Sequence, residues 1–305
     1  MRFFRTAPGT LLLIAAIGTV AALGMTAVQV HRVTHPARQP ELRVNLGAAL
    51  AKVEDVTFRA ADGTDLDGWL FRGKPGRPPI VLCHDLDESK NALMNLAIAL
   101  NKAGFTVLAF DFRAHGGSGG ARATFGTEEA RDVLGAVDYL GDLPAGTVDT
   151  KRFGIFGSGM GASAAVLAAA DRPVLRVLVL DGLWPDARAS LVRHTFPDWP
   201  WAAKHLGALP AALFPLVAGV SLDERRAEDV LPELAGRDLL LVAPAGDGRL
   251  DESMRAMYAK LPERRDVERN LITLPATRAS GLGADDLARY HEKVVAFFSS
   301  RLGNL

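Results

Sequence analysis

Cysteine and net charge are almost absent from this sequence. The chain of 305 residues has one cysteine, Cys83, so it cannot form an internal disulfide and does not indicate a redox compartment. Its 35 basic and 35 acidic side chains cancel, and no long run of like charge occurs. Such a balance lacks the electrostatic signature of nucleic-acid binding. We therefore expect a globular protein that does not bind nucleic acid.

Charged side chains are also missing from residues 6–30. The apolar stretch at residues 11–30 has about the 20 residues that a helix needs to cross a bilayer. Arg2 and Arg5 precede it, as in a signal peptide or signal anchor. The stretch is longer than the roughly 7–15 apolar residues of a cleaved signal peptide, and the segment around Met25 is a poor cleavage site. We predict a retained single-pass anchor at about residues 10–30, with a cleaved signal peptide as the alternative.

The residues after this stretch predict a linker and then one domain. Residues 31–40 contain prolines and basic side chains, which are typical of a linker beside a membrane. Arginines stand on both sides of the apolar stretch, so the positive-inside rule does not decide the orientation. We favour an extracytoplasmic domain slightly. Residues 1–40 are expected to form the anchor and linker, and residues 41–305 the domain.

Short apolar runs alternate with helical patterns along the rest of the chain. The runs predict strands at residues 56–59, 68–71, 79–83, 105–110, 152–156, 174–180, 239–242 and 271–274. The first pair, around the Asp62-Gly63 turn signal, is expected to be antiparallel. Buried strands that alternate with helices predict a mostly parallel sheet with helices on both faces. Cys83 falls inside a strand and is expected in the core rather than as a nucleophile.

Residues 184–223 interrupt this rhythm. The segment contains five prolines and three of the four tryptophans. We predict a small helical insertion over the strand ends. It could be a lid or the wall of a ligand cavity, or it could be an irregular crossover with its own packing; the sequence leaves both open.

Three segments carry a family resemblance. Residues 110–119 read FDFRAHGGSG, residues 123–140 follow with ATFGTEEARDVLGAVDYL, and residues 152–162 read RFGIFGSGMGA. Together they resemble the α/β-hydrolases, in particular the membrane-anchored Bem46-like and serine-aminopeptidase-like branch. The resemblance implies an eight-stranded, mostly parallel sheet with helices on both faces and a small helical cap.

The resemblance also implies a nucleophile elbow, which is altered here. The family places a serine at the centre of Gly-x-Ser-x-Gly between a strand and a helix. In this chain the centre of the motif is Gly159, and Ser158 stands one position early. We expect that the nucleophile is lost and that Gly159 keeps the turn with a positive φ. Ser158 is the alternative nucleophile.

The acid and base positions follow from the same resemblance. Asp247 matches the acid position, although an ordinary turn aspartate fits the Gly-Asp-Gly sequence equally well. The histidine position matches Ala279, so the general base is missing. His291 comes later in the chain, and we expect it on the surface of the last helix.

The oxyanion side differs as well. Where the family has His-Gly, this chain has His84-Asp85. The backbone N–H groups of Leu86 and Met160 are the expected oxyanion-hole donors. Asp85 would add negative charge there unless it points away. His84, Asp85 and His115 are expected at strand ends that line a cavity, where ligands bind in open α/β sheets. We expect no metal or cofactor, since no short His/Asp spacing imposes one.

Two functions are compatible with these patterns. The first is a membrane-anchored α/β-hydrolase homologue without catalysis that binds a small molecule or a protein. The second is an active serine hydrolase, acting on ester or amide bonds, in which Ser158 uses His84, His115 or His194. Labelling with a fluorophosphonate separates them.

Overall fold

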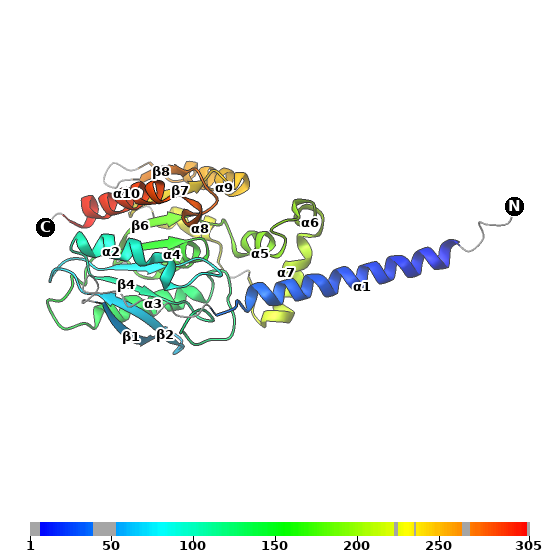
Figure 1. Ribbon diagram of the computed structural model, residues 1–305, viewed down its shortest axis with the longest axis horizontal. Coiled ribbons are helices and arrows are strands. Elements are labelled where there is room, and N and C mark those ends of the chain that lie inside the picture. Colours follow the sequence, from blue (N-terminus) through cyan, green and yellow to red (C-terminus); the bar gives the residue numbers. More distant parts are fainter. Residues whose placement is uncertain (1–6, 39–52, 223–224, 235, 264–268, 304–305) are drawn as a thin grey trace.

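An eight-stranded sheet forms the centre of the molecule in the computed structural model, which describes residues 7–38, 53–222, 225–234, 236–263 and 269–303 (Figure 1). The strand order is β1-β2-β4-β3-β5-β6-β7-β8. The strands are β1 (Val53–Arg59), β2 (Asp65–Phe71), β3 (Ile80–Cys83), β4 (Val107–Phe110), β5 (Phe153–Ser158), β6 (Leu175–Asp181), β7 (Asp238–Pro244) and β8 (Arg269–Leu274). Each predicted strand is present.

The pairing of the strands is mostly parallel. β2 pairs antiparallel with β1 and β4, and the strands from β3 to β8 run parallel to one another. Parallel strands with connections between them end at one edge of the sheet, so the loops after β3, β5, β6, β7 and β8 meet there. This edge carries the candidate site.

Helices cover both faces of the sheet, as predicted for buried parallel strands. Side chains alternate between two separate hydrophobic clusters: Val81 and Cys83 belong to one, and Ile80 and Leu82 belong to the other. The helices of the domain are α2 (Met94–Lys102), α3 (Glu129–Gly141), α4 (Met160–Asp171), α8 (Ala227–Val230), α9 (Gly248–Ala259) and α10 (Ala284–Leu302), with the short 3₁₀ helices η2 (Lys90–Leu93), η3 (Leu231–Leu234) and η4 (Ala279–Gly281).

The predicted insertion is a cap of three helices. These are α5 (Ala187–Thr195), α6 (Pro200–Leu206) and α7 (Ala208–Ala218). The Asp186 side chain caps α5 by accepting a hydrogen bond from the Ala189 N–H. The cap lies at one end of the molecule, on the side from which α1 projects (Figure 1).

The N-terminal apolar stretch forms a single long helix, α1 (Ala7–Thr34), with the length and hydropathy of a membrane span. Its last turns pack against α5 and α7. Thr26, Val30 and Thr34, which are four residues apart, form the buried face of α1. This packing involves the end of the predicted anchor, at Thr26 and Val30, and the start of the predicted linker, at Thr34.

Candidate functional site

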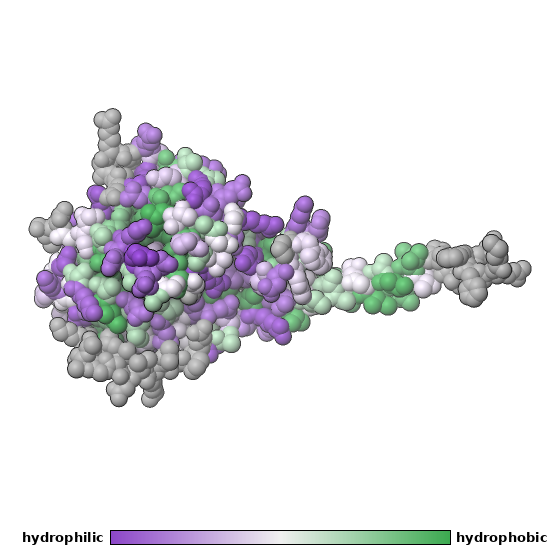
Figure 2. All heavy atoms as spheres, turned by 45° about the horizontal axis from the view of Figure 1, so that its top comes forward, coloured by the Kyte–Doolittle hydropathy of each residue, from purple (hydrophilic) through white to green (hydrophobic). Residues whose placement is uncertain are grey.

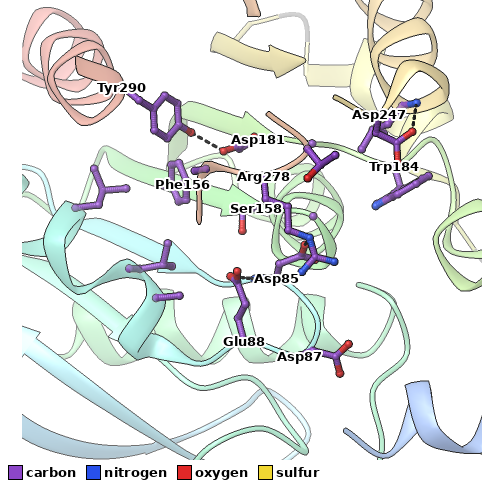
Figure 3. Close-up of a pocket in the computed structure, with 18 of the residues that line it drawn as sticks. Asp85, Asp87, Glu88, Phe156, Ser158, Asp181, Trp184, Asp247, Arg278 and Tyr290 are labelled. Carbon is purple, nitrogen blue, oxygen red and sulfur yellow. Dashed lines mark hydrogen bonds and ion pairs between the residues drawn. The ribbon is translucent and has the colours of Figure 1, made fainter. Parts of the chain in front are cut away.

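A cavity of about 290 Å³ opens at the carboxyl ends of the parallel strands (Figure 3). Residues at or just after the ends of several strands line this cavity. The lining includes Asp85 and Glu88 after β3, Ser158 at the end of β5, Asp181 at the end of β6, Asp247 after β7, and Arg278 and Ala279 after β8. The cap adds Trp184, Arg193 and His194.

The elbow turn keeps its shape. Gly159 lies between β5 and α4 with φ 50° and ψ −111°, so the predicted positive φ is confirmed. A non-glycine residue rarely adopts this conformation, and it costs about 1–3 kcal/mol. The helix also passes very close to the neighbouring strand: a Cβ on Gly161 would lie 2.4 Å from the Cys83 carbonyl oxygen. Glycine at both positions allows the sharp turn.

The Asp85 carboxylate occupies the place predicted for the oxyanion hole. Its Oδ1 atom accepts hydrogen bonds from the Leu86 N–H at 2.7 Å and from the Met160 N–H at 2.8 Å. These are the two backbone donors that the sequence predicted. An oxyanion hole works when its donors are free to bind charge that develops on a substrate. Here a buried carboxylate of the chain itself already accepts from both.

The same carboxylate fills the space next to Gly159. A Cβ on Gly159 would lie 1.9 Å from Asp85 Oδ1 and 2.1 Å from Cγ. Real Cβ atoms do not approach so closely, so a serine at residue 159 requires Asp85 to move. Asp85 and Gly159 both depart from the family pattern, and the Asp85 carboxylate occupies the space that a side chain at residue 159 would need.

Arginine side chains contact two of the carboxylates that line the cavity, Asp247 and Asp85. Asp247 accepts from Arg193 Nε of the cap at 3.0 Å, and its side chain also caps α9 through the Leu250 N–H. Ala279 begins η4, and its neighbour Arg278 reaches to 3.9 Å from Asp85 Oδ2. The carboxylate at the acid position therefore binds a guanidinium from the cap.

The three histidines considered for an alternative triad, His84, His115 and His194, do not form one with Ser158. In the described part of the chain, no histidine nitrogen makes a hydrogen bond with the Ser158 hydroxyl. His84 Nδ1 donates to the Asp85 carbonyl at 2.7 Å while Nε2 accepts from the Phe112 N–H. Burial, together with His115, lowers the pKa of His84 to about 4. His115 and His194 bind backbone carbonyls through Nδ1.

Only some of the predicted cavity residues line the cavity. Asp85 does, whereas His84 and His115 are buried outside the lining, with their ring centroids 5.0 Å apart. The surface position expected for His291 is wrong. His291 is half-buried and lines the cavity, and burial lowers its pKa. The face of α10 that carries Tyr290 and His291 turns toward the strand ends, which the position of His291 within the helix alone did not indicate.

Two further carboxyl groups in the cavity have raised pKa values. Burial, with Asp85 nearby, raises the pKa of Glu88 to about 7. Burial also raises the pKa of Asp181 to about 7, although the Tyr290 hydroxyl donates to Asp181 Oδ2 at 2.7 Å (Figure 3). Asp181 directly follows the strand predicted at residues 174–180. Sequence reasoning missed Glu88, Tyr290, Arg193 and Arg278, because their approach depends on how the loops and helices pack.

Solved structures share this fold. An esterase of Pyrococcus furiosus matches with a TM-score of 0.65 at 22% identity, covering 87% of this chain and 98% of the esterase. The α/β hydrolase GrgF from Penicillium sp. sh18 matches with a TM-score of 0.63 at 17% identity, covering 83% and 99%. The chain therefore has the α/β-hydrolase fold. A family profile described as serine aminopeptidase, S33, matches residues 75–219.

Sequence relatives match a shorter region. An uncharacterized protein of Mycobacterium tuberculosis is 34% identical over 121 residues, which is 39% of this chain and 42% of the relative. A thiohydrolase of Arthrinium phaeospermum is 30% identical over 129 residues, 41% of each chain. The chain thus spans less than half the length of each of these relatives.

Proposed function

We propose that this protein is a membrane-anchored α/β-hydrolase-fold protein of the Bem46-like, serine-aminopeptidase-like branch that binds a ligand or partner without hydrolysing it. The observation that carries the proposal is the Asp85 carboxylate on the Leu86 and Met160 N–H groups. An acyl substrate needs these donors for its oxyanion, and removing one such donor costs about 10²–10³ in rate. Occupation of both by a fixed carboxylate opposes that chemistry.

The positions matched to a triad support the same proposal. Gly159 has no side chain to act as a nucleophile, Ala279 has no group that takes a proton, and Asp247 binds Arg193. A serine without a positioned base is a weak nucleophile at neutral pH. Binding instead uses the cavity, where polar groups stand beside apolar side chains such as Phe156 and Leu287.

A fluorophosphonate probe and an activated ester test this proposal. We expect no labelling and no turnover above background with the purified full chain. Gly159→Ser with Ala279→His is expected to stay inactive, because Asp85 still fills the hole and collides with the new side chain. Adding Asp85→Gly to these two changes opens the hole and gives the best prospect of labelling.

The competing hydrolase has a clear signature. Labelling of the unaltered chain that disappears in Ser158→Ala would establish Ser158 as a nucleophile and overturn the proposal. Ser163→Ala is the matched control, because Ser163 lies buried inside α4, one turn after the elbow.

A further inference from the structure

Exposed large hydrophobic side chains gather around the cap. Within the described part of the chain they lie either on α1 or in the cap. The cap contributes Trp199, Trp201 and Leu216, with exposed fractions of 44%, 63% and 82%. Soluble surfaces scatter such residues singly, whereas a cluster marks an interaction site.

Helix α7 has an apolar outer face. From Ala208 to Ala218 it contains no charged or hydrogen-bonding side chain. Pro210, Phe214 and Ala218 form its buried face. The exposed positions are also apolar: Ala208, Ala212, Pro215 and Leu216. A helix that is apolar all round is normally covered on all sides, by protein or by lipid.

The length of α1 places a bilayer next to this face. Because α1 packs on the cap from Thr26 onward, residues 7–25 are the part of α1 that is free to lie in a membrane. At 1.5 Å per residue they span about 28 Å, close to the roughly 30 Å of a hydrocarbon core. Their full length is therefore needed to cross. The bilayer surface must then reach the point where α1 meets the cap.

We infer that α6 and α7 rest on the lipid bilayer beside α1, through a cap face made of Trp199, Trp201, Leu216 and the exposed residues of α7. Tryptophan favours the headgroup level, where its ring meets both lipid and water. Lys204 and His205, exposed in the last turn of α6, can face lipid phosphates. Figure 2 shows the hydrophobic α1 leaving a largely hydrophilic domain surface. This inference rests on the proposed anchor.

Site-specific fluorescence tests the cap face. Cys83 is the single cysteine and is buried, so a thiol introduced on the surface can be labelled selectively. Leu216→Cys is labelled with a fluorophore in the full chain, reconstituted into vesicles of phosphatidylcholine and phosphatidylglycerol. Ser300→Cys is the matched control, since Ser300 is exposed near the end of α10, which lies at the opposite end of the molecule from α1 (Figure 1).

Two quenchers give opposite readings. We expect brominated lipid to quench the label in Leu216→Cys and to leave Ser300→Cys unchanged, while iodide on both sides of the membrane quenches mainly Ser300→Cys. Equal iodide quenching of the two variants would overturn the inference. Protection of Leu216→Cys from both quenchers would also overturn it and would indicate that a second copy of the chain covers the cap face. Failure of the anchor is distinct: the unlabelled chain would then not float with the vesicles.

Discussion

At the residue scale, Asp85 and Gly159 depend on each other. The carboxylate can fill the oxyanion hole because residue 159 has no Cβ, and residue 159 cannot gain one while the carboxylate is there. The sequence revealed each departure from the family pattern separately. It could not show that they share one volume, because the direction of the Asp85 side chain is set by the Leu86 and Met160 N–H groups.

Gly159→Ala should therefore destabilise the unaltered chain more than it destabilises a chain that already carries Asp85→Gly. The positive φ costs about 1–3 kcal/mol in both backgrounds, and the collision with Asp85 adds roughly 1–3 kcal/mol in the first alone. The coupling between the two residues is measured from the free energies of unfolding of the unaltered chain, Gly159→Ala, Asp85→Gly and the double variant. Gly63→Ala, with φ 88° and open space around the new Cβ, is the control for strain alone. Equal costs in both backgrounds would contradict the shared volume.

The raised pKa values of Glu88 and Asp181 predict a pH dependence of stability. Both are about 7 in the folded chain, against about 4 when unfolded. Between these values the folded state holds protons that the unfolded state releases. Their contribution to the free energy of unfolding is therefore full below about pH 4 and is lost as pH rises through 7.

Glu88→Gln and Asp181→Asn should flatten this dependence. Each variant is expected to gain stability relative to the unaltered chain as pH rises from about 4 to 7, by up to about 1.4 kcal/mol per pH unit. Thermal unfolding at a series of pH values gives the difference. Asp142→Asn, which removes an exposed carboxyl at the end of α3, should show no such trend. Parallel profiles for all the proteins would contradict the prediction.

At the scale of elements, sequence periodicity predicted the strands of the sheet and the helices between them. Buried strands such as β3 and β5 are short apolar runs whose two faces both meet helices, so their composition identifies them. Packing across the chain was not predictable in this way. The contact of α1 with the cap joins elements more than 150 residues apart and leaves no local pattern except the spacing of Thr26, Val30 and Thr34.

That contact predicts how the chain responds to changes in α1. Val30→Ala should lower the free energy of unfolding by roughly 1–2 kcal/mol, at about 0.8 kcal/mol for each buried methylene lost. Val20→Ala is the matched control on the same helix, because Val20 is 70% exposed. Unfolding in detergent measures both. Equal effects of the two substitutions would contradict packing of α1 on the cap.

Truncation of α1 should reveal the same contact. Removal of residues 1–25 should leave the unfolding temperature close to that of the full chain, because the packed turns of α1 remain. Removal of residues 1–40 should lower it and promote aggregation, because α5 and α7 then lose Val30 and the Thr34 carbonyl, which accepts from the Ala123 N–H, is gone. Identical unfolding of the two shortened chains would count against a stabilising contact.

At the scale of the whole molecule, α1 could be either a membrane anchor or a signal sequence. An anchor and a cleaved signal sequence share the apolar composition of α1, but a signal sequence ends at a cleavage site. Here the helix continues without a break into turns that pack on the cap, through Val30 and Thr34. Cleavage near Met25 would cut inside this continuous helix. The fold of the domain thus favours retention of the helix.

We therefore predict that the full chain, at its intact mass, sediments with membranes and stays there after a carbonate wash. The variant Ile14→Asp with Ile17→Asp should shift it to the soluble fraction, since each charge in the middle of a span costs about 2.5–3.5 kcal/mol. Val20→Ala, which keeps the span apolar, should behave like the unaltered chain. A shortened mature form, or an intact chain that is washed off by carbonate, would refute the anchor; it would leave the fluorophosphonate test of the cavity unaffected, because that test concerns Asp85 and Gly159.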